Sequence, residues 1–299
     1  DLRFHMIHHF TANIVEKNLS KYQKFKISAY SCHILTKQGM MQTCNNQFIN
    51  VNGKTMNLSH PQVMGILHIT PDSFYSESRK QTEAEIITRI HQIHEEGASI
   101  IDIGACSTRP NAELVSAKEE VKRLRMGLQL INRHWPNAVI SVDTFRADTA
   151  KMCVEEDNAA IINDISSGDM DKQMFTTVSH LGVPYIMMHM KGTPQNMQNR
   201  PHYDNLLKEI FSHFSERIQK LYDLGAKDLI LDPGFGFGKT MEHNYELMNH
   251  LNEFHIFGLP ILVGASRKSM IYNLLECSPQ DSLNGTTVLN TLALTKGAN

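Results

Sequence analysis

The chain has 299 residues, of which 41% are hydrophobic, so it can bury a large core, and single barrels reach this length. Basic and acidic residues nearly balance, 29 to 31, and no apolar run approaches the roughly 18–20 residues that span a bilayer, so neither nucleic acid nor a membrane is an expected partner. The five cysteines are odd in number and form no Cys-x-x-Cys pair, which favours a cytoplasmic protein over a disulfide-stapled secreted one.

Residues 1–46 differ in character from the rest of the chain. They are rich in lysine, lack a strong hydrophobic periodicity and begin at Asp1 rather than at a methionine. We interpret them as a poorly ordered extension, or as upstream sequence ahead of a true start at Met40 or Met41. A transit peptide is the alternative because acidic residues are few, although arginine is scarce as well. The folded domain is expected to span residues 47–299.

A β-hairpin opens this domain. Short strand-like runs at residues 48–51 and 55–58 flank Asn52-Gly53, the dipeptide that best tolerates the two positive φ angles of a tight hairpin turn. We expect the hairpin to plug one end of the main domain.

Seven short apolar runs then alternate with helical patterns. Their near-continuous hydrophobicity is typical of parallel strands that are covered on both faces. The runs are residues 64–69, 99–103, 138–142, 159–162, 184–188, 228–231 and 260–263. Repeated β-then-α units predict a parallel sheet, either doubly wound or closed into a barrel.

Helix boundaries are indicated between these runs. Thr82 and Ser116 each precede a glutamate by three residues, the spacing of a capping box. Gly97, Gly182 and Gly225 fall where a helix would end, because glycine tolerates the left-handed conformation found there.

Polar residues at the strand ends decide between the two architectures. An open sheet gathers ligand groups at one switch point, whereas a barrel collects them from every strand around one mouth. Here polar groups follow all seven runs: Thr70 and Asp72, Asp102, Asp143, Asn163 and Asp164, His189, Asp232, and Ser266-Arg267-Lys268. The pattern therefore predicts an α/β fold of the (β/α)₈ TIM-barrel type with an N-terminal β-hairpin.

The eighth strand of that barrel is expected to be missing from this chain. The helix-end signals Gly97-Ala98 and Gly225-Ala226 each lead into a strand, and the chain closes on the same signal at Gly297-Ala298-Asn299. We predict that the natural protein continues into a further strand, so that the domain at residues 47–299 is truncated at its C-terminus.

Taken together, the strand ends resemble those of the dihydropteroate synthase family over residues 48–299. The matching segments are residues 64–67 with 70–74, 102–104 with 107–110, 141–144, 162–165, 188–190, 232–239 and 266–269. Each segment alone is a weak signal, but all seven occur in order and each lies at a strand end. The resemblance implies a transferase that condenses 6-hydroxymethyl-7,8-dihydropterin diphosphate with 4-aminobenzoate, giving 7,8-dihydropteroate and diphosphate.

The resemblance also implies a pterin pocket. A pterin carries an edge with several N–H donors, which a carboxylate accepts in pairs. The positions that match the family's pterin-binding residues are Asp143, Asn163, Ile165, Met188, Asp232, Phe237, Gly264 and Lys268. Asp232 would receive the donors, Lys268 would donate to ring acceptors, and Met188, Ile165 and Phe237 would pack on the ring faces.

Catalytic roles are expected for Asp143, Lys268 and Arg109. Loss of diphosphate leaves positive charge on the pterin methylene group, which a fixed Asp143 carboxylate would stabilise. The guanidinium of Arg109 suits the departing diphosphate. The second pocket, for 4-aminobenzoate and diphosphate, would use Phe74, Thr108, Arg109, Pro110, Arg267 and Ser269, the last at a helix start that favours an anion.

Magnesium is the implied cofactor, bridging the phosphates mostly through oxygen ligands and water. The first strand ends in His68 where the family has a metal-contacting asparagine, and imidazole suits magnesium less well. The first loop also departs from the family's pattern, with Ser76 at the position of its aspartate. These changes gather around diphosphate rather than around the pterin.

Other interpretations stay open at this stage. His189 fits a core histidine better than a ligand, and Asp164 fits a structural role. A non-catalytic pterin-binding paralogue is favoured by His68 and the altered loops, whereas a pterin-dependent methyltransferase of the same superfamily should lack residues 107–110 and 266–268 as they stand here. The family resemblance further implies a homodimer formed through late helices.

Overall fold

The computed structural model describes residues 48–69, 79–106, 115–197 and 200–299. The predicted extension at residues 1–46 lies outside this part of the chain. The hairpin is confirmed: β1 (Phe48–Val51) pairs antiparallel with β2 (Lys54–Asn57). Its turn residues Asn52 and Gly53 have φ angles of 50° and 75°, as a tight hairpin turn requires.

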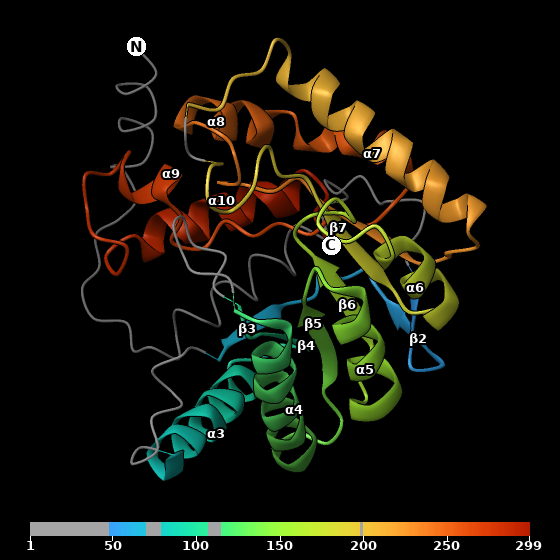
Figure 1. The fold of residues 1–299 in the computed structure, drawn as a ribbon. Coiled ribbons are helices and arrows are strands. Elements are labelled where there is room, and N and C mark those ends of the chain that lie inside the picture. Colours follow the sequence, from blue (N-terminus) through green and yellow to red (C-terminus); the bar gives the residue numbers. More distant parts are fainter. Residues whose placement is uncertain (1–47, 70–78, 107–114, 198–199) are drawn as a thin grey trace.

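Six parallel strands form the main sheet and follow one another in chain order. They are β3 (Met64–His68), β4 (Ile100–Gly104), β5 (Val139–Asp143), β6 (Ile161–Asp164), β7 (Tyr185–Met188) and β8 (Leu229–Asp232). The helices are α3 (Arg79–Glu95), α4 (Ala117–His134), α5 (Ala147–Asp157), α6 (Met174–Leu181), α7 (Leu206–Asp223), α8 (Met241–Asn249), the 3₁₀ helix η2 (Leu251–Phe257), α9 (Ser269–Tyr272) and α10 (Leu283–Thr295). Figure 1 shows helices α3 to α6 around the outside of the curved sheet. The predicted α/β class with a parallel sheet is confirmed.

Most predicted helix boundaries hold. The Ser116 hydroxyl accepts a hydrogen bond from the backbone N–H of Glu119 and caps α4, and Gly182 ends α6 with a φ of 65°. The prediction that a helix begins after Thr82 is wrong, because α3 already begins at Arg79. Arginine, lysine and glutamine are good helix formers, so residues 79–81 extend the helix ahead of the expected cap. None of the helices in the described ranges combines the length and apolar character needed to cross a membrane.

The seventh predicted strand, at residues 260–263, is reduced to a single parallel bridge between Leu231 and Ile261. Beside this bridge, the backbone N–H of Leu231 donates to the Pro260 carbonyl at 2.9 Å. On its other side, the backbone N–H of Asn299 donates to the Ile261 carbonyl at 3.1 Å. The described residues do not test the predicted eighth strand, which stays a prediction.

Two apolar layers hold the fold together. The larger packs the outward-facing side chains of the sheet, such as Ile101 and Ile103, against the helices, for example Leu124 and Leu128 of α4. The smaller lies at the amino ends of the strands, where the hairpin and its neighbour Leu58 pack against inward-facing isoleucines. The hairpin therefore covers one end of the sheet, as predicted, and the carboxyl ends form the other.

Candidate active site

The strand register brings the predicted pterin ligands to one mouth. Side chains two residues apart in a strand point to the same face. Because the isoleucines at the amino ends point inward against the hairpin, the residues two positions later also point inward. Four inward-pointing site residues each follow an isoleucine by two positions: Asp102 follows Ile100, Asn163 follows Ile161, Met188 follows Ile186 and Asp232 follows Ile230. Asp143 is the register partner of Asn163 on the neighbouring strand.

Asp102 lies at the centre of this cluster. Its Oδ2 accepts a hydrogen bond from Nδ2 of Asn163 at 3.2 Å, and its Oδ1 accepts from the Ser141 hydroxyl at 2.6 Å. Burial raises the pKa of Asp102, and these two hydrogen bonds oppose that rise. An ionised carboxylate only accepts, so Asn163 turns its amide N–H toward Asp102, and its own oxygen stays available as an acceptor.

Asp102 was not predicted as a site residue, although it was noted at a strand end. The signal that marks it is a carboxyl group inside a run of isoleucines, residues 100–103, since charged groups are rarely fully buried without partners. Its partners lie 39 and 61 residues away in the sequence, so only the strand register reveals them.

Asp143 and His68 lie on either side of Gly104. A Cβ atom added to Gly104 would be 3.3 Å from Oδ2 of Asp143 and 3.1 Å from Nδ1 of His68, so both side chains reach the same place. Burial raises the pKa of Asp143 well above its usual range, and the negative charges of Asp102, Asp164 and Glu120 add to the rise. The neighbouring negative charges favour a cation beside Asp143.

Asp232 and Lys268 form the opposite side of the cluster. Oδ1 of Asp232 accepts from the backbone N–H of Gly234 at 2.8 Å. Burial raises the pKa of Asp232, and the Lys268 ammonium opposes this. Burial likewise lowers the pKa of Lys268 to about 8, opposed by the Asp232 carboxylate. The charged form of each group is thus favoured by the other within a buried site.

Phe237 and Gly264 border Lys268, as the predicted pocket requires. The Lys268 ammonium donates to the carbonyl of Phe235 and lies 4.6 Å from the centroid of the Phe237 ring, a cation–π contact. A Cβ atom on Gly264 would lie 3.9 Å from the Lys268 Nζ atom, an ordinary contact. The packing of this chain therefore does not require a glycine at position 264. A bound ligand stays the predicted reason for this glycine.

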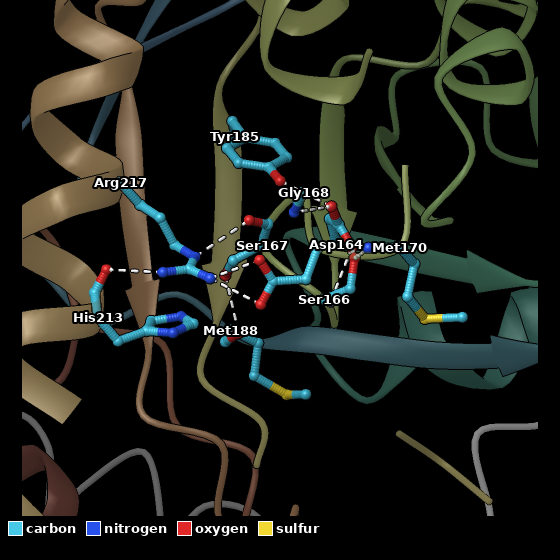
Figure 2. Close-up of polar contacts among 10 residues, drawn as sticks. Asp164, Ser166, Ser167, Gly168, Met170, Tyr185, Met188, His213 and Arg217 are labelled. Atoms are coloured by element: carbon cyan, nitrogen blue, oxygen red, sulfur yellow. Dashed lines mark hydrogen bonds and ion pairs between the residues drawn. The ribbon is translucent and has the colours of Figure 1, made fainter. Parts of the chain in front are cut away.

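Behind the cluster, a polar network holds the loop that follows β6 (Figure 2). Oδ2 of Asp164 accepts from the Tyr185 hydroxyl at 2.7 Å and from the backbone N–H of Gly168 at 2.8 Å. The Ser167 hydroxyl donates to the carbonyl of Met188 at 2.8 Å, and Arg217 of α7 reaches the Ser167 carbonyl. Asp164 is fully buried and bonded at both oxygens, which agrees with a structural role.

The network also places the two apolar pterin candidates. Met188 and Ile165 are both buried; the Met188 carbonyl is itself part of the network, and Ile165 lies between Asp164 and Ser166, which the network fixes. His189, next along the chain, is buried too, and its Nδ1 lies 2.9 Å from the Lys239 Nζ atom. Burial lowers the pKa of His189 well below its usual range, so it is a neutral core histidine, as expected.

The second predicted pocket is described only in part. Phe74, Thr108, Arg109 and Pro110 lie outside the described residues. The guanidinium of Arg267 donates to the carbonyl oxygens of Pro279 and Gln280. Ser269 does begin a helix, α9, but that helix has four residues, so its dipole is small. The roles of these residues stay predictions.

Arg146 contacts both residues that flank the segment 107–114. Its guanidinium donates to the Val115 carbonyl at 2.7 Å and lies 3.7 Å from the Cys106 sulfur. It also forms an ion pair with the fully buried Glu120, which accepts from the Thr144 hydroxyl as well. One network thus joins Thr144, the residue after Asp143, to both flanks of the segment that carries Arg109.

The described residues offer few ligands for the magnesium ion that the family resemblance implies. Within residues 48–69, 79–106, 115–197 and 200–299, no three His, Cys, Asp or Glu side chains are grouped so as to hold a metal. Magnesium favours oxygen ligands and commonly binds through one or two carboxylates plus substrate phosphates. The Asp143 carboxylate beside His68 offers oxygen, and the diphosphate would have to supply the rest.

Comparison with known proteins identifies the class of this site and then the family. The sequence profile of the family described as "Pterin binding enzyme" matches residues 64–299, so the chain belongs to the class of pterin-binding enzymes. The dihydropteroate synthase of Escherichia coli K12 is 41% identical over 248 residues, which cover 82% of this chain and 87% of that protein. The chain belongs to the dihydropteroate synthase family.

Solved structures of similar proteins agree. A dihydropteroate synthase from Yersinia pestis in complex with a sulfonamide drug has a TM-score of 0.75 and 38% identity, and the match covers 84% of this chain and 91% of that one. The Xanthomonas albilineans enzyme in complex with 7,8-dihydropteroate has a TM-score of 0.73 and 31% identity, over 84% of this chain and 90% of that one.

Proposed function

We propose that this chain is a dihydropteroate synthase, a transferase that condenses 6-hydroxymethyl-7,8-dihydropterin diphosphate with 4-aminobenzoate to give 7,8-dihydropteroate and diphosphate. The observation that carries this proposal is the meeting of Asn163, Asp232 and Lys268 at one mouth of a pterin-binding fold. Family membership adds to it, since a relative from Xanthomonas albilineans has been solved with 4-aminobenzoic acid and another structure with 7,8-dihydropteroate.

The pterin ring is recognised by its hydrogen-bonding edges. The Asp232 carboxylate and the Asn163 amide oxygen accept from the N–H groups of the ring, and Lys268 donates to its acceptors. Met188, Ile165 and Phe237 pack against the flat faces, with Gly264 leaving room beside Lys268.

The reaction is a substitution at the methylene carbon of the pterin. The bond from this carbon to the diphosphate oxygen breaks, and diphosphate leaves with the electron pair. The amine nitrogen of 4-aminobenzoate forms the new bond and then loses a proton. Asp143 stabilises the positive charge that develops on the methylene group, and that charge in turn restores the ionised form of a carboxyl whose pKa burial has raised.

The remaining contacts serve the second substrate and the leaving group. Arg109 and Arg267 supply positive charge to the diphosphate, and Phe74, Thr108, Pro110 and Ser269 border the 4-aminobenzoate. When bound, magnesium would neutralise phosphate charge, with His68 beside it and oxygen ligands from the substrate.

The protein acts as a cytoplasmic homodimer in this proposal. Leu283 and Leu292 of α10, and Leu275 ahead of it in the chain, are 46%, 40% and 51% exposed, and large apolar side chains on the surface favour an interface. Cys106 and Cys153 are buried free thiols, which suits a reducing compartment.

Incubation of the protein with pterin diphosphate, 4-aminobenzoate and magnesium tests the function. We expect diphosphate release that depends on 4-aminobenzoate. The alternative is a non-catalytic pterin-binding paralogue, which the sequence departures at His68 and Ser76 favour. Pterin binding in calorimetry without any such release would support the paralogue and overturn the synthase.

A further inference from the structure

Lys239, at the end of the turn that follows β8, is buried without a role in the reaction as described above. Its side chain is 3% exposed. Burial lowers the pKa of its ammonium to about 7, although the nearby Asp232 charge opposes this. A buried ammonium is costly unless hydrogen bonds replace its lost water, so its surroundings need an explanation.

The ammonium of Lys239 sits among main-chain carbonyls of two segments. Its Nζ lies 2.9 Å from the Gly234 carbonyl, 3.2 Å from the Phe237 carbonyl, and 3.2 Å and 2.9 Å from the carbonyl and Nδ1 of His189. An ammonium has three N–H donors, which these acceptors saturate. Lys239 therefore ties the turn at residues 233–238 to the end of β7.

The turn is shaped for this close approach. A Cβ atom on Gly234 would lie 2.0 Å from the His189 carbonyl oxygen, and one on Gly238 would lie 2.3 Å from the Lys191 carbonyl oxygen. Both glycines also have positive φ angles, 72° and 63°. Only glycine permits this path, so the sequence is adapted to lay the turn directly on the backbone after β7.

The same turn holds three of the pterin contacts. The Gly234 N–H donates to Asp232 while the Gly234 carbonyl accepts from Lys239, so one peptide segment links the two side chains. The Phe235 carbonyl accepts from the Lys268 ammonium, and the Phe237 ring lies beneath that ammonium.

We propose that Lys239 is a positioning residue of the pterin pocket: by fixing the turn at residues 233–238 on the end of β7, it places Asp232, Phe237 and Lys268 for the ring. It does not touch the substrate itself. The inference rests on the proposed function, because it assigns these contacts to the pterin.

Steady-state kinetics of Lys239→Met test the proposal. We expect the KM for pterin diphosphate to rise about tenfold or more, while the KM for 4-aminobenzoate stays within about twofold, because only the pterin contacts depend on the turn. Lys191→Met is the matched control: its ammonium bonds to Glu209 and the His202 carbonyl at 40% exposure, and both KM values should stay unchanged. Equal changes in both KM values for Lys239→Met, or none, would overturn the proposal.

A double-mutant cycle separates positioning from general damage. Lys239→Met combined with Lys268→Met should weaken pterin binding by less than the product of the two single effects, because Lys239 acts partly through Lys268. Independent, multiplicative losses would contradict a shared route.

Asn244→Ala decides the matter even if Lys239→Met does not fold. Asn244 of α8 holds the same turn from its other side, accepting from the Gly236 N–H at 2.7 Å and donating to the Lys239 carbonyl at 3.3 Å. We expect a smaller rise in the pterin KM, again without a change for 4-aminobenzoate. An unchanged pterin KM would show that the turn does not set pterin affinity. A wild-type protein without diphosphate release would instead refute the proposed function.

Discussion

The two ends of the same parallel strands differ in kind. At the amino ends, the inward-facing residues are isoleucines that pack against Ile49, Val51 and Leu58 of the hairpin region. Two residues further along, at the carboxyl ends, the inward positions hold Asp102, Asn163, Met188 and Asp232. One end is filled and closed by the chain itself, whereas the other presents charged groups whose pKa values burial has shifted.

The amino ends of the strands contribute stability, and the carboxyl ends carry the groups for chemistry. Burial of apolar side chains stabilises the amino end without regard to any ligand. At the carboxyl end, burial and then the charges of neighbouring acidic groups raise the pKa of Asp143, and this arrangement costs stability unless a ligand uses it. Substitutions at the amino ends should therefore lower the free energy of unfolding, whereas substitutions at the carboxyl ends should lower substrate affinity or the reaction rate.

The largest effect is expected for Asp232→Ala. Removal of this carboxyl leaves ring N–H donors without acceptors, at about 1–3 kcal/mol each, so pterin affinity should fall about a hundredfold or more. Calorimetric titration with the pterin measures the loss. Unchanged affinity would refute the assignment of Asp232 to the ring edge.

Asp143→Asn should mainly slow the chemical step. The amide keeps the shape of the side chain but lacks the negative charge, so kcat should fall about a hundredfold while pterin affinity is largely retained. Single-turnover kinetics with a parallel binding measurement separate the two effects. An equal loss of affinity and rate would count against an electrostatic role.

Ile49→Ala should lower stability and leave substrate binding unchanged. Ile49 is 2% exposed in the apolar layer, so truncation should lower the free energy of unfolding by about 2–4 kcal/mol. Both KM values should be unchanged at temperatures where the variant stays folded. A loss of pterin affinity comparable with that of Asp232→Ala would contradict the separation of the two ends.

The smallest effect concerns the pH dependence of stability. The raised pKa of Asp143 means that the folded state holds this proton more tightly than the unfolded state. The carboxyl thus contributes stability that is complete below about pH 4 and is lost as pH rises through the folded-state pKa. Asp143→Asn should therefore be more stable than wild type at pH 7, and the gain should vanish in acid.

Denaturant titrations of both proteins across this pH range measure the difference. A variant that is less stable than wild type at neutral pH would show that Asp143 is held by favourable partners rather than by burial and like charge.

The sequence predicts the elements better than the contacts. The hairpin follows from Asn52-Gly53, and the strands follow from their apolar runs, because both signals are local. The hydrogen bonds of Asp102 to Asn163 and of Lys239 to His189 join residues 61 and 50 positions apart, and they depend on strand register and on the path of a turn. No local pattern carries that information. The reduced strand at Ile261 likewise depends on its neighbours rather than on its own apolar residues.

A crystal structure of this protein with 7,8-dihydropteroate is the most direct test of the account. We predict that the carboxylate of Asp232 and the amide oxygen of Asn163 lie within hydrogen-bonding distance of the pterin N–H groups, with the Lys268 ammonium at the ring acceptors. A product molecule bound elsewhere, or in this pocket with its N–H edge turned away from both residues, would contradict it.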